Sequence, residues 1–230
     1  MGLNIEVGVF DDLKNADPEG FEDLFGCLKA ASDFLVANGL PAHSEPPNLE
    51  PWGAQMYGYS GLHYLRRLAA HIDAGLDLPG PGDDKSSKDD VVHGYYASFN
   101  TGIKAVLSTL MPWRRKFRRS FDHLIYHSDA EGFYLPVDFP NVLIAIDDPK
   151  ILGGIVGSVP RLLGECDRLA EILGIPEGLN AESDELWDAA DSQGEGEETW
   201  QRYGIETYSC VVLREGCRKS METGAALVFT

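Results

Sequence analysis

Two segments of the chain carry the full start and stop signals of an amphipathic helix, and they constrain its fold more than any other feature. The first begins at Asp17, an N-cap residue followed by Pro18 at the first helical position, and it ends at Asn38 and Gly39. Between these limits, apolar residues recur at spacings of three and four positions. They are Phe21, Leu24, Leu28, Ala31 and Leu35.

The second segment begins at Ser158, has Pro160 two positions later, and closes at Gly174 and Pro176. Its apolar residues again recur at helical spacing from Leu162 to Leu173. A helix with one apolar face must bury that face against another layer of structure. Both segments therefore predict a packed, helix-rich globular chain.

The remaining patterns place the chain in the α+β class. Leu3–Phe10 alternates in polarity, which is typical of a half-buried strand, whereas residues 141–146 fit a strand or a helix core equally well. Further helices are predicted at 60–75, 91–121 and about 200–223, and further strands at 124–126, 133–135 and 225–229. We therefore expect residues 1–230 to form a single, predominantly helical α+β domain with a small, mostly antiparallel sheet.

Three segments lack such periodicity. Residues 79–90 consist of turn formers and charged residues, which predicts a flexible surface loop. Residues 41–57 hold four prolines and predict an ordered irregular loop. Residues 177–198 are acidic and interrupted by glycines.

The formal net charge of −18, from 37 acidic and 19 basic residues, argues against binding to nucleic acid or to an anionic membrane surface. The charge is not uniform along the chain. Residues 61–120 carry 10 basic and 6 acidic residues, whereas every other block of similar length is acidic. A basic segment therefore lies within an acidic protein.

The four cysteines lack a Cys-x-x-Cys spacing, and three of them lie in apolar helical patterns, which favours free thiols in a reducing compartment. The start of the chain lacks the basic and apolar regions of a signal peptide, and no run approaches about 20 apolar residues. These features predict a soluble, cytoplasmic protein.

A cluster of histidines and carboxylates is the first candidate site. If the chain is helical there, His123 and His127 lie on one face at a spacing used by metal sites, with Asp129 as a further ligand. If it is extended, His127, Asp129 and Glu131 share one face. The alternative is that residues 128–132 form a turn that needs no ligand, because Ser and Asp side chains bond to the nearby backbone and Gly132 accepts a positive φ.

A basic run just before this cluster is the second candidate. Residues 113–119 hold five cations and two aromatic residues, a composition found at phosphate-binding strips. The high negative charge of the chain favours pairing with its own acids or with a protein partner instead. We therefore list Arg114, Arg115, Arg66 and Arg67, together with His127, Asp129 and Glu131, as candidate partner-binding residues.

The sequence contains none of the common catalytic or phosphate-binding motifs, so its catalytic residues, if any, are unknown. Aromatic residues near the proline-rich loop could line a pocket for a small ligand, although aromatic residues are more often part of a core. They are Trp52, Tyr57, Tyr59 and Tyr95.

The segment from His127 to Pro136, together with Tyr59–His63 upstream, resembles a segment of small uncharacterised bacterial proteins, some of which are similar to immunity proteins of toxin systems. The resemblance implies a cytosolic acidic protein that binds one partner and has no catalytic residues. Our first hypothesis is thus an immunity-like, protein-binding domain without a cofactor. The alternatives are a metal-dependent hydrolase that uses residues 123–131 with a divalent ion, and a small-ligand-binding protein.

Overall fold

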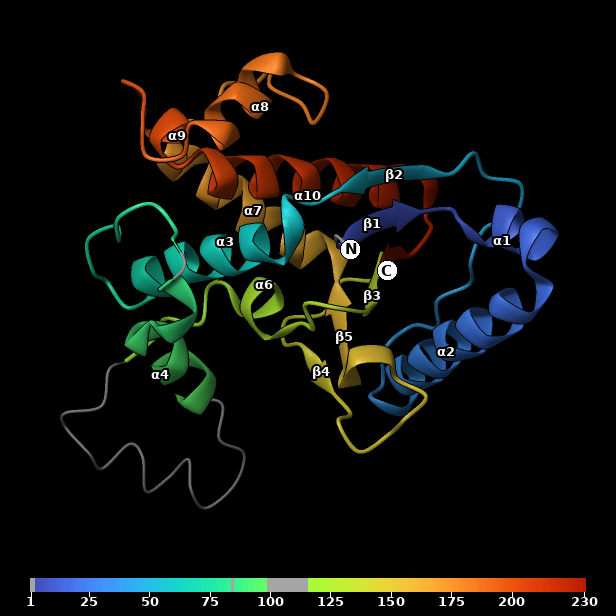
Figure 1. The fold of residues 1–230 in the computed structure, drawn as a ribbon. Coiled ribbons are helices and arrows are strands. Elements are labelled where there is room, and N and C mark those ends of the chain that lie inside the picture. The colour runs from blue at the N-terminus through green and yellow to red at the C-terminus, as the bar shows by residue number, and fades with distance from the viewer. Residues whose placement is uncertain (1–2, 84, 99–115) are drawn as a thin grey trace.

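The computed structural model describes residues 3–83, 85–98 and 116–230, and within them six strands form one sheet (Figure 1). The strand order is β2-β1-β6-β3-β5-β4. The strands are β1 (Asn4–Val7), β2 (Trp52–Gln55), β3 (Gly132–Leu135), β4 (Leu143–Ile144), β5 (Ile155–Ser158) and β6 (Leu227–Phe229). Only β3 and β5 pair in parallel, which confirms a mostly antiparallel sheet.

Helices dominate the described residues and cover both faces of the sheet (Figure 1). They are α1 (Phe10–Ala16), α2 (Pro18–Ala37), α3 (Gly58–Asp73), α4 (Asp90–Ser98), α6 (Asp122–Tyr126), α7 (Val159–Leu173), α8 (Asp184–Asp191), α9 (Thr199–Arg202) and α10 (Gly204–Thr223). Single 3-10 turns lie at Ser86–Lys88 and Leu152–Gly154. The prediction of a helix-dominated α+β chain is confirmed.

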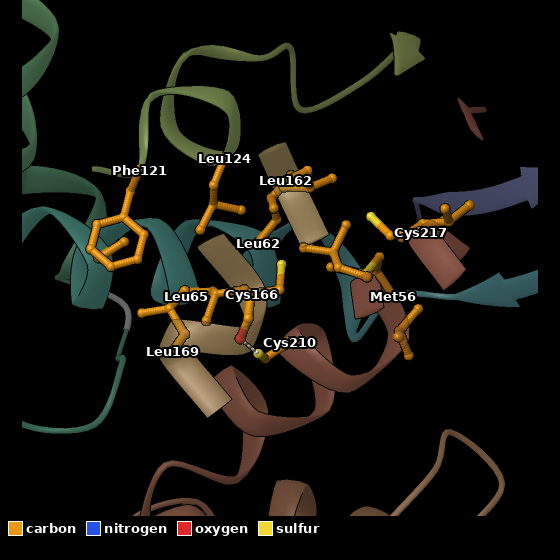
Figure 2. Packing of buried hydrophobic residues seen from close by; sticks show 14 of the residues in the cluster. Met56, Leu62, Leu65, Phe121, Leu124, Leu162, Cys166, Leu169, Cys210 and Cys217 are labelled. Carbon is orange, nitrogen blue, oxygen red and sulfur yellow. Dashed lines mark hydrogen bonds between the residues drawn. The ribbon is translucent and has the colours of Figure 1, made fainter. Parts of the chain in front are cut away.

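The larger hydrophobic core lies between one face of the sheet and the helices α3, α7 and α10. Figure 2 shows Leu62 and Leu65 of α3 meeting Leu162, Cys166 and other residues of α7. All four cysteines of the chain are free. Three of them are fully buried in this core, where they behave as small apolar residues, as the sequence predicted.

The second core lies on the opposite face of the sheet, under α1 and α2. The strands supply both cores because their side chains alternate between the two faces. In β6, Leu227 and Phe229 belong to the larger core, whereas Val228 lies against α2 in the second. The same alternation places Tyr134 in the first core and Phe133 in the second.

The two helices with full capping signals are present with the predicted limits. Asp17 accepts a hydrogen bond from the N–H of Gly20 at 3.1 Å and so caps α2. Gly174 ends α7 in the left-handed conformation, with φ of 69°. Local sequence signals thus suffice where both ends of a helix are marked.

Three local predictions need correction. The aromatic and β-branched run Leu124–Tyr126 belongs to helix α6, not to a strand. The predicted irregular loop 41–57 contains the edge strand β2, and the acidic region 177–198 contains α8. The predicted helix 91–121 is present as α4 up to Ser98, and residues 116–121 are not helical, whereas 99–115 lie outside the described residues.

The predicted loop 79–90 lies against the helices in several places. The Tyr203 hydroxyl donates to the carbonyl of Pro79 at 2.6 Å, and the N–H of Gly82 donates to Glu206 at 2.8 Å. Arg67 donates to the carbonyl of Gly80 at 2.8 Å. The start of the segment, residues 79–82, is therefore anchored to α3, to α10 and to Tyr203 just before α10, and the flexibility predicted from the composition of the segment stays a prediction.

Among the described residues, no helix combines the length and the apolar character that a membrane crossing requires.

Gly204 sets the position of α8 on α10, and replacing it with alanine is expected to lower the free energy of unfolding by about 2 to 3 kcal/mol. A Cβ atom at this position would overlap the backbone of Ala189 and Ala190 in α8, which cannot move aside as a flexible side chain could. Urea denaturation would measure the loss. Gly164→Ala in α7 is the matched control: nothing lies near its Cβ position, so a gain of about 0.5 to 1 kcal/mol is expected.

Candidate functional site

The segment from His127 to Gly132 forms the turn between α6 and β3. The Ser128 hydroxyl oxygen accepts hydrogen bonds from the N–H groups of Ala130 and Glu131, at 3.3 and 3.4 Å. Gly132 has a φ of 132°, which favours glycine. The turn interpretation of the sequence is therefore confirmed.

The His127 side chain is part of the core and not of the surface. Its ring stacks on Tyr134, with 3.9 Å between the ring centroids. Its Nδ1 and Nε2 atoms lie 3.1 Å from the carbonyl oxygens of Ser128 and Phe133, respectively. Burial lowers the pKa of His127 to about 4, so the ring is neutral at pH 7.

The other predicted metal ligands have separate partners. The Nδ1 atom of His123 accepts the N–H of Ser158 at 3.0 Å, and burial lowers the pKa of His123 to about 4. Asp129 lies at the surface and pairs with His63 at 3.1 Å, while Glu131 is exposed. In the part of the chain that the structure describes, no three His, Cys, Asp or Glu side chains form a group that could hold a metal ion.

Arg66, predicted as a candidate partner-binding residue, does not lie at the surface: its side chain is buried and bonded within the fold. Its Nε atom donates to the carbonyl of Leu124 at 2.8 Å, and its Nη2 atom donates to the carbonyl of His127 at 2.6 Å. A third carbonyl, that of Ser128, lies 3.2 Å from Nη2. Arg66 thus caps the C-terminal end of α6 with its positive charge.

Glu165 of α7 caps the other end of the same helix. Its two carboxylate oxygens accept the N–H groups of His123 and Leu124, at 3.0 and 2.7 Å. Burial raises the pKa of Glu165 to about 8, although the two N–H bonds act in the opposite direction. A five-residue helix is consequently held between two buried side chains, the guanidinium group of Arg66 from α3 and the carboxyl group of Glu165 from α7.

Arg67 and His71 of α3 form an internal network with Asp89. Both side chains contact the Asp89 carboxylate, at 2.9 and 3.0 Å, and this carboxylate also caps α4 through the N–H of Val91. Burial raises the pKa of Asp89, but the hydrogen bonds from Arg67 and His71 outweigh it and hold the pKa at about 2. The sequence does not reveal this pairing, because the partners lie 18 and 22 positions apart.

The basic run is described only in part, since Arg114 and Arg115 lie outside the described residues. Arg119 lies near Asp122, with 3.7 Å between Nη1 and the carboxylate, and it also donates to the Tyr126 hydroxyl. The N–H groups of Arg119 and Ser120 donate to the buried carboxylate of Asp73. Arg119, the last cation of the run, therefore pairs with the protein's own acids.

The four aromatic residues considered for a ligand pocket do not share one. Tyr95 is fully buried in the larger core, and Tyr59 is exposed. Trp52 lines a groove beside β2, and Tyr57 donates from its hydroxyl to Asp191 at 2.9 Å.

Helices α8 and α9 and the loop between them carry the densest acidic surface of the described chain. Between Arg168 and Arg202 the sequence has no Lys, Arg or His. Eight acidic residues at positions 182–198 of this interval are exposed, and within the described residues none of them forms an ion pair. They are Glu182, Asp184, Glu185, Asp188, Asp191, Glu195, Glu197 and Glu198.

The sequence of α8 explains why these acids face outward. Leu186, Ala189 and Ala190 are buried on one side of the helix, against α10. Asp184, Asp188 and Asp191 are spaced four and three positions apart, which puts them together on the opposite side. A hollow of about 590 Å³ lies beside them, between α8 and α9, and Trp200 lines part of it.

The N-terminal helices carry a second group of acids, including Asp12, Glu19 and Glu22, but cations lie among them. Lys14 is exposed in the same region, with its ammonium group 5.6 Å from the centre of the Phe21 ring. The α8–α9 surface is thus the described region in which negative charge is least compensated. The acidity of this region is evident from the sequence, but its role as a surface is not, because the acids share a face only when α8 is formed.

Comparison of the sequence with family models finds a match over residues 1–229 to a family described as "Putative DNA-mimic protein". No curated protein matches the chain, and no solved structure matches it.

Proposed function

The chain belongs to the family described as putative DNA-mimic proteins, and from this premise we propose that it binds the DNA-binding surface of a protein partner through the acids of α8 and α9. The observation that carries the proposal is the run of eight exposed carboxylates at residues 182–198, none of which forms an ion pair within the described residues. A protein surface that recognises phosphates through Lys and Arg side chains would meet a similar array of negative charges here.

The spacing of charge along α8 supports this role. Four acids lie between Asp184 and Asp191, so the three intervals between them span about 10.5 Å at a rise of about 1.5 Å per residue. This gives one carboxylate per about 3.5 Å of helix axis, compared with one phosphate per about 3.4 Å of helix axis on each strand of B-DNA. The density of negative charge along α8 is therefore similar to that along one DNA strand.

The net charge of the chain favours the same role. A charge of −18 attracts basic surfaces over long distances and repels nucleic acid, so association with a basic protein would be fast and sensitive to salt. The sequence resemblance to immunity-like proteins implies the same mode of binding to a different partner. The identity of the partner distinguishes the two proposals.

Competition with DNA tests the proposal directly. The immobilised chain would be exposed to a nuclease-treated extract of the source cells, and bound proteins would be eluted with a short DNA duplex. Each eluted protein would then be purified, and its binding to labelled duplex measured with increasing amounts of the chain. We expect the chain to displace the DNA, with an apparent affinity that falls as salt rises.

Amide substitution on α8 locates the surface. Asp184→Asn, Asp188→Asn and Asp191→Asn together should weaken competition by about tenfold or more, since each lost charge removes a contact to a partner cation. Glu19→Gln, Glu22→Gln and Asp23→Asn on α2 remove the same charge elsewhere and should change it by about twofold or less. If DNA elutes no protein, or if the α8 variant competes as well as the α2 variant, the proposal is wrong.

A further inference from the structure

We propose that a groove along the free edge of β2 binds an extended, lysine- or arginine-bearing segment of the protein partner as an added β-strand. The inference rests on the proposed function, because it assumes a partner with the basic segments typical of DNA-binding proteins. It concerns a different part of the surface from the outer face of α8.

β2 lies at the end of the sheet, beside α10 (Figure 1), and among the described residues it pairs on one side only, with β1. The N–H of Met56 donates to the carbonyl of Leu3 at 2.9 Å, which fixes the direction of the alternating backbone groups. The N–H and C=O groups of Gly53 and the N–H group of Gln55 consequently point away from β1. The structure shows no hydrogen bond from these three groups to any described residue.

The fourth group that points away from β1 is the carbonyl of Gln55, and its contact shows that the free edge of β2 faces the groove. The carbonyl of Gln55 accepts a hydrogen bond from the Tyr208 hydroxyl of α10 at 3.1 Å. Tyr208 and Trp187 of α8 pack together, with 4.5 Å between ring centroids, and both line the groove opposite β2. The groove has a volume of about 580 Å³, which has room for a short extended segment.

The walls of the groove favour a cationic occupant. Two carboxylates, Glu182 and Glu215, line it, and no Lys or Arg does so among the described residues. The Trp187 side chain is 41% exposed, so the face of its ring can receive an ammonium or guanidinium group. Backbone hydrogen bonds would hold the segment, while alternate side chains would meet the acids and the aromatic rings.

The edge also lacks the features by which proteins prevent strand addition. Exposed edge strands are commonly protected by Lys, Pro or a bulge. β2 has the sequence Trp-Gly-Ala-Gln, without a charged residue or proline, and its pairing with β1 has no bulge. At Gly53 the absence of a side chain leaves the backbone open to approach.

Synthetic peptides test the inference. The first probe alternates lysine and threonine over about eight residues, and the second replaces each threonine by proline, which keeps the charge but removes half of the N–H donors. Fluorescence anisotropy with labelled peptides would measure both affinities. We expect the lysine–threonine peptide to bind about tenfold more tightly, because only this peptide can complete the backbone hydrogen bonds.

Gly53→Pro removes an outward N–H group and should abolish this difference between the peptides. Proline is tolerated on an edge strand when its nitrogen faces away from the neighbouring strand, and a Cβ at this position meets only ordinary contacts. Circular dichroism would check the fold. Should the variant not fold, Glu182→Gln with Glu215→Gln provides the second test, with an expected loss of about fivefold. The matched control, Glu19→Gln with Glu22→Gln, should lose about twofold or less.

Equal binding of the two peptides to the wild-type chain would overturn the inference, as would a Gly53→Pro variant that still prefers the lysine–threonine peptide. An equal loss in the two glutamine variants would overturn it too, because binding would then reflect net charge alone. If DNA competition succeeds and these peptide results fail, only the groove is excluded. If the peptides behave as expected and DNA competition fails, the groove binds a basic partner and the proposed function is wrong.

Discussion

Replacing Arg66 with alanine is expected to lower the free energy of unfolding by about 3 to 5 kcal/mol, because a buried cation that donates to three carbonyls is removed from the end of a helix. Its guanidinium group donates to the carbonyls of Leu124, His127 and Ser128. These oxygens would lose their donor, and a buried acceptor without a partner costs about 1 to 3 kcal/mol. Native domains are stable by only about 5 to 15 kcal/mol, so the variant should be close to unfolding.

Urea denaturation followed by circular dichroism would measure the loss. Arg161→Ala is the matched control. Arg161 forms an ion pair with Asp138 at 2.6 Å, as short as the hydrogen bond from Arg66 to the carbonyl of His127, but the Arg161 side chain is 46% exposed. Exposed ion pairs contribute about 0 to 1 kcal/mol, so this control should change stability little. A loss in Arg66→Ala no larger than that in Arg161→Ala would show that Arg66 does not hold α6 in place.

The position of Arg66 shows where sequence patterns stop being informative. The spacing of Leu62, Leu65 and Ala69 correctly predicted α3 and one buried face. The structure buries Arg66 as well, because α6, which begins 56 positions later in the chain, packs beside it. Periodicity within a helix cannot identify a partner so far away, and a charged residue is assigned to solvent by default.

Helix α6 was missed for a related reason. Leu124, Ile125 and Tyr126 favour a strand by local preference, yet α6 places all three in the core. A five-residue helix gains little from its own backbone hydrogen bonds. Its stability comes from Arg66 and Glu165, which belong to other helices, so tertiary contacts override the local preference.

The candidate surface could be predicted only as composition. The acidic residues of 182–198 are visible in the sequence, but the helical pattern of α8 depends on Leu186 and two alanines, which give a weak apolar signal. Without the helix, the acids have no common face. In contrast, the His127–Gly132 turn was correctly predicted because Ser128 and Gly132 determine its geometry locally.

Glu165 should make the protein less stable as pH rises from about 6.5 to 8.5. Burial raises the pKa of its carboxyl from 4.5 to about 8 in the folded protein, so the folded state binds the proton more tightly than the unfolded state. Stability from this group is complete below pH 4.5 and is lost as pH rises through 8. One pKa unit corresponds to about 1.4 kcal/mol, so the whole change is at most about 5 kcal/mol.

The buried histidines act in the opposite direction and in a lower pH range. Burial lowers the pKa values of His123 and His127 to about 4, so these residues reduce stability as pH falls below about 6.5. At pH 6.5 each histidine is still about half protonated in the unfolded state, so the histidines complete their change between pH 6.5 and about 7.5. This change is the same in the wild-type chain and in a Glu165 variant, so the difference between the two proteins isolates the carboxyl group.

Glu165→Gln removes the titrating group while keeping an oxygen that can accept one of the two N–H bonds from α6. We expect the wild-type chain to lose about 2 kcal/mol more than the variant between pH 6.5 and 8.5. Burial also raises the pKa of Glu206, and this contribution is common to both proteins, so it cancels in their difference. Parallel stability curves would mean that Glu165 keeps its charge in the folded state and that the N–H groups of α6, with Arg168 nearby, outweigh burial.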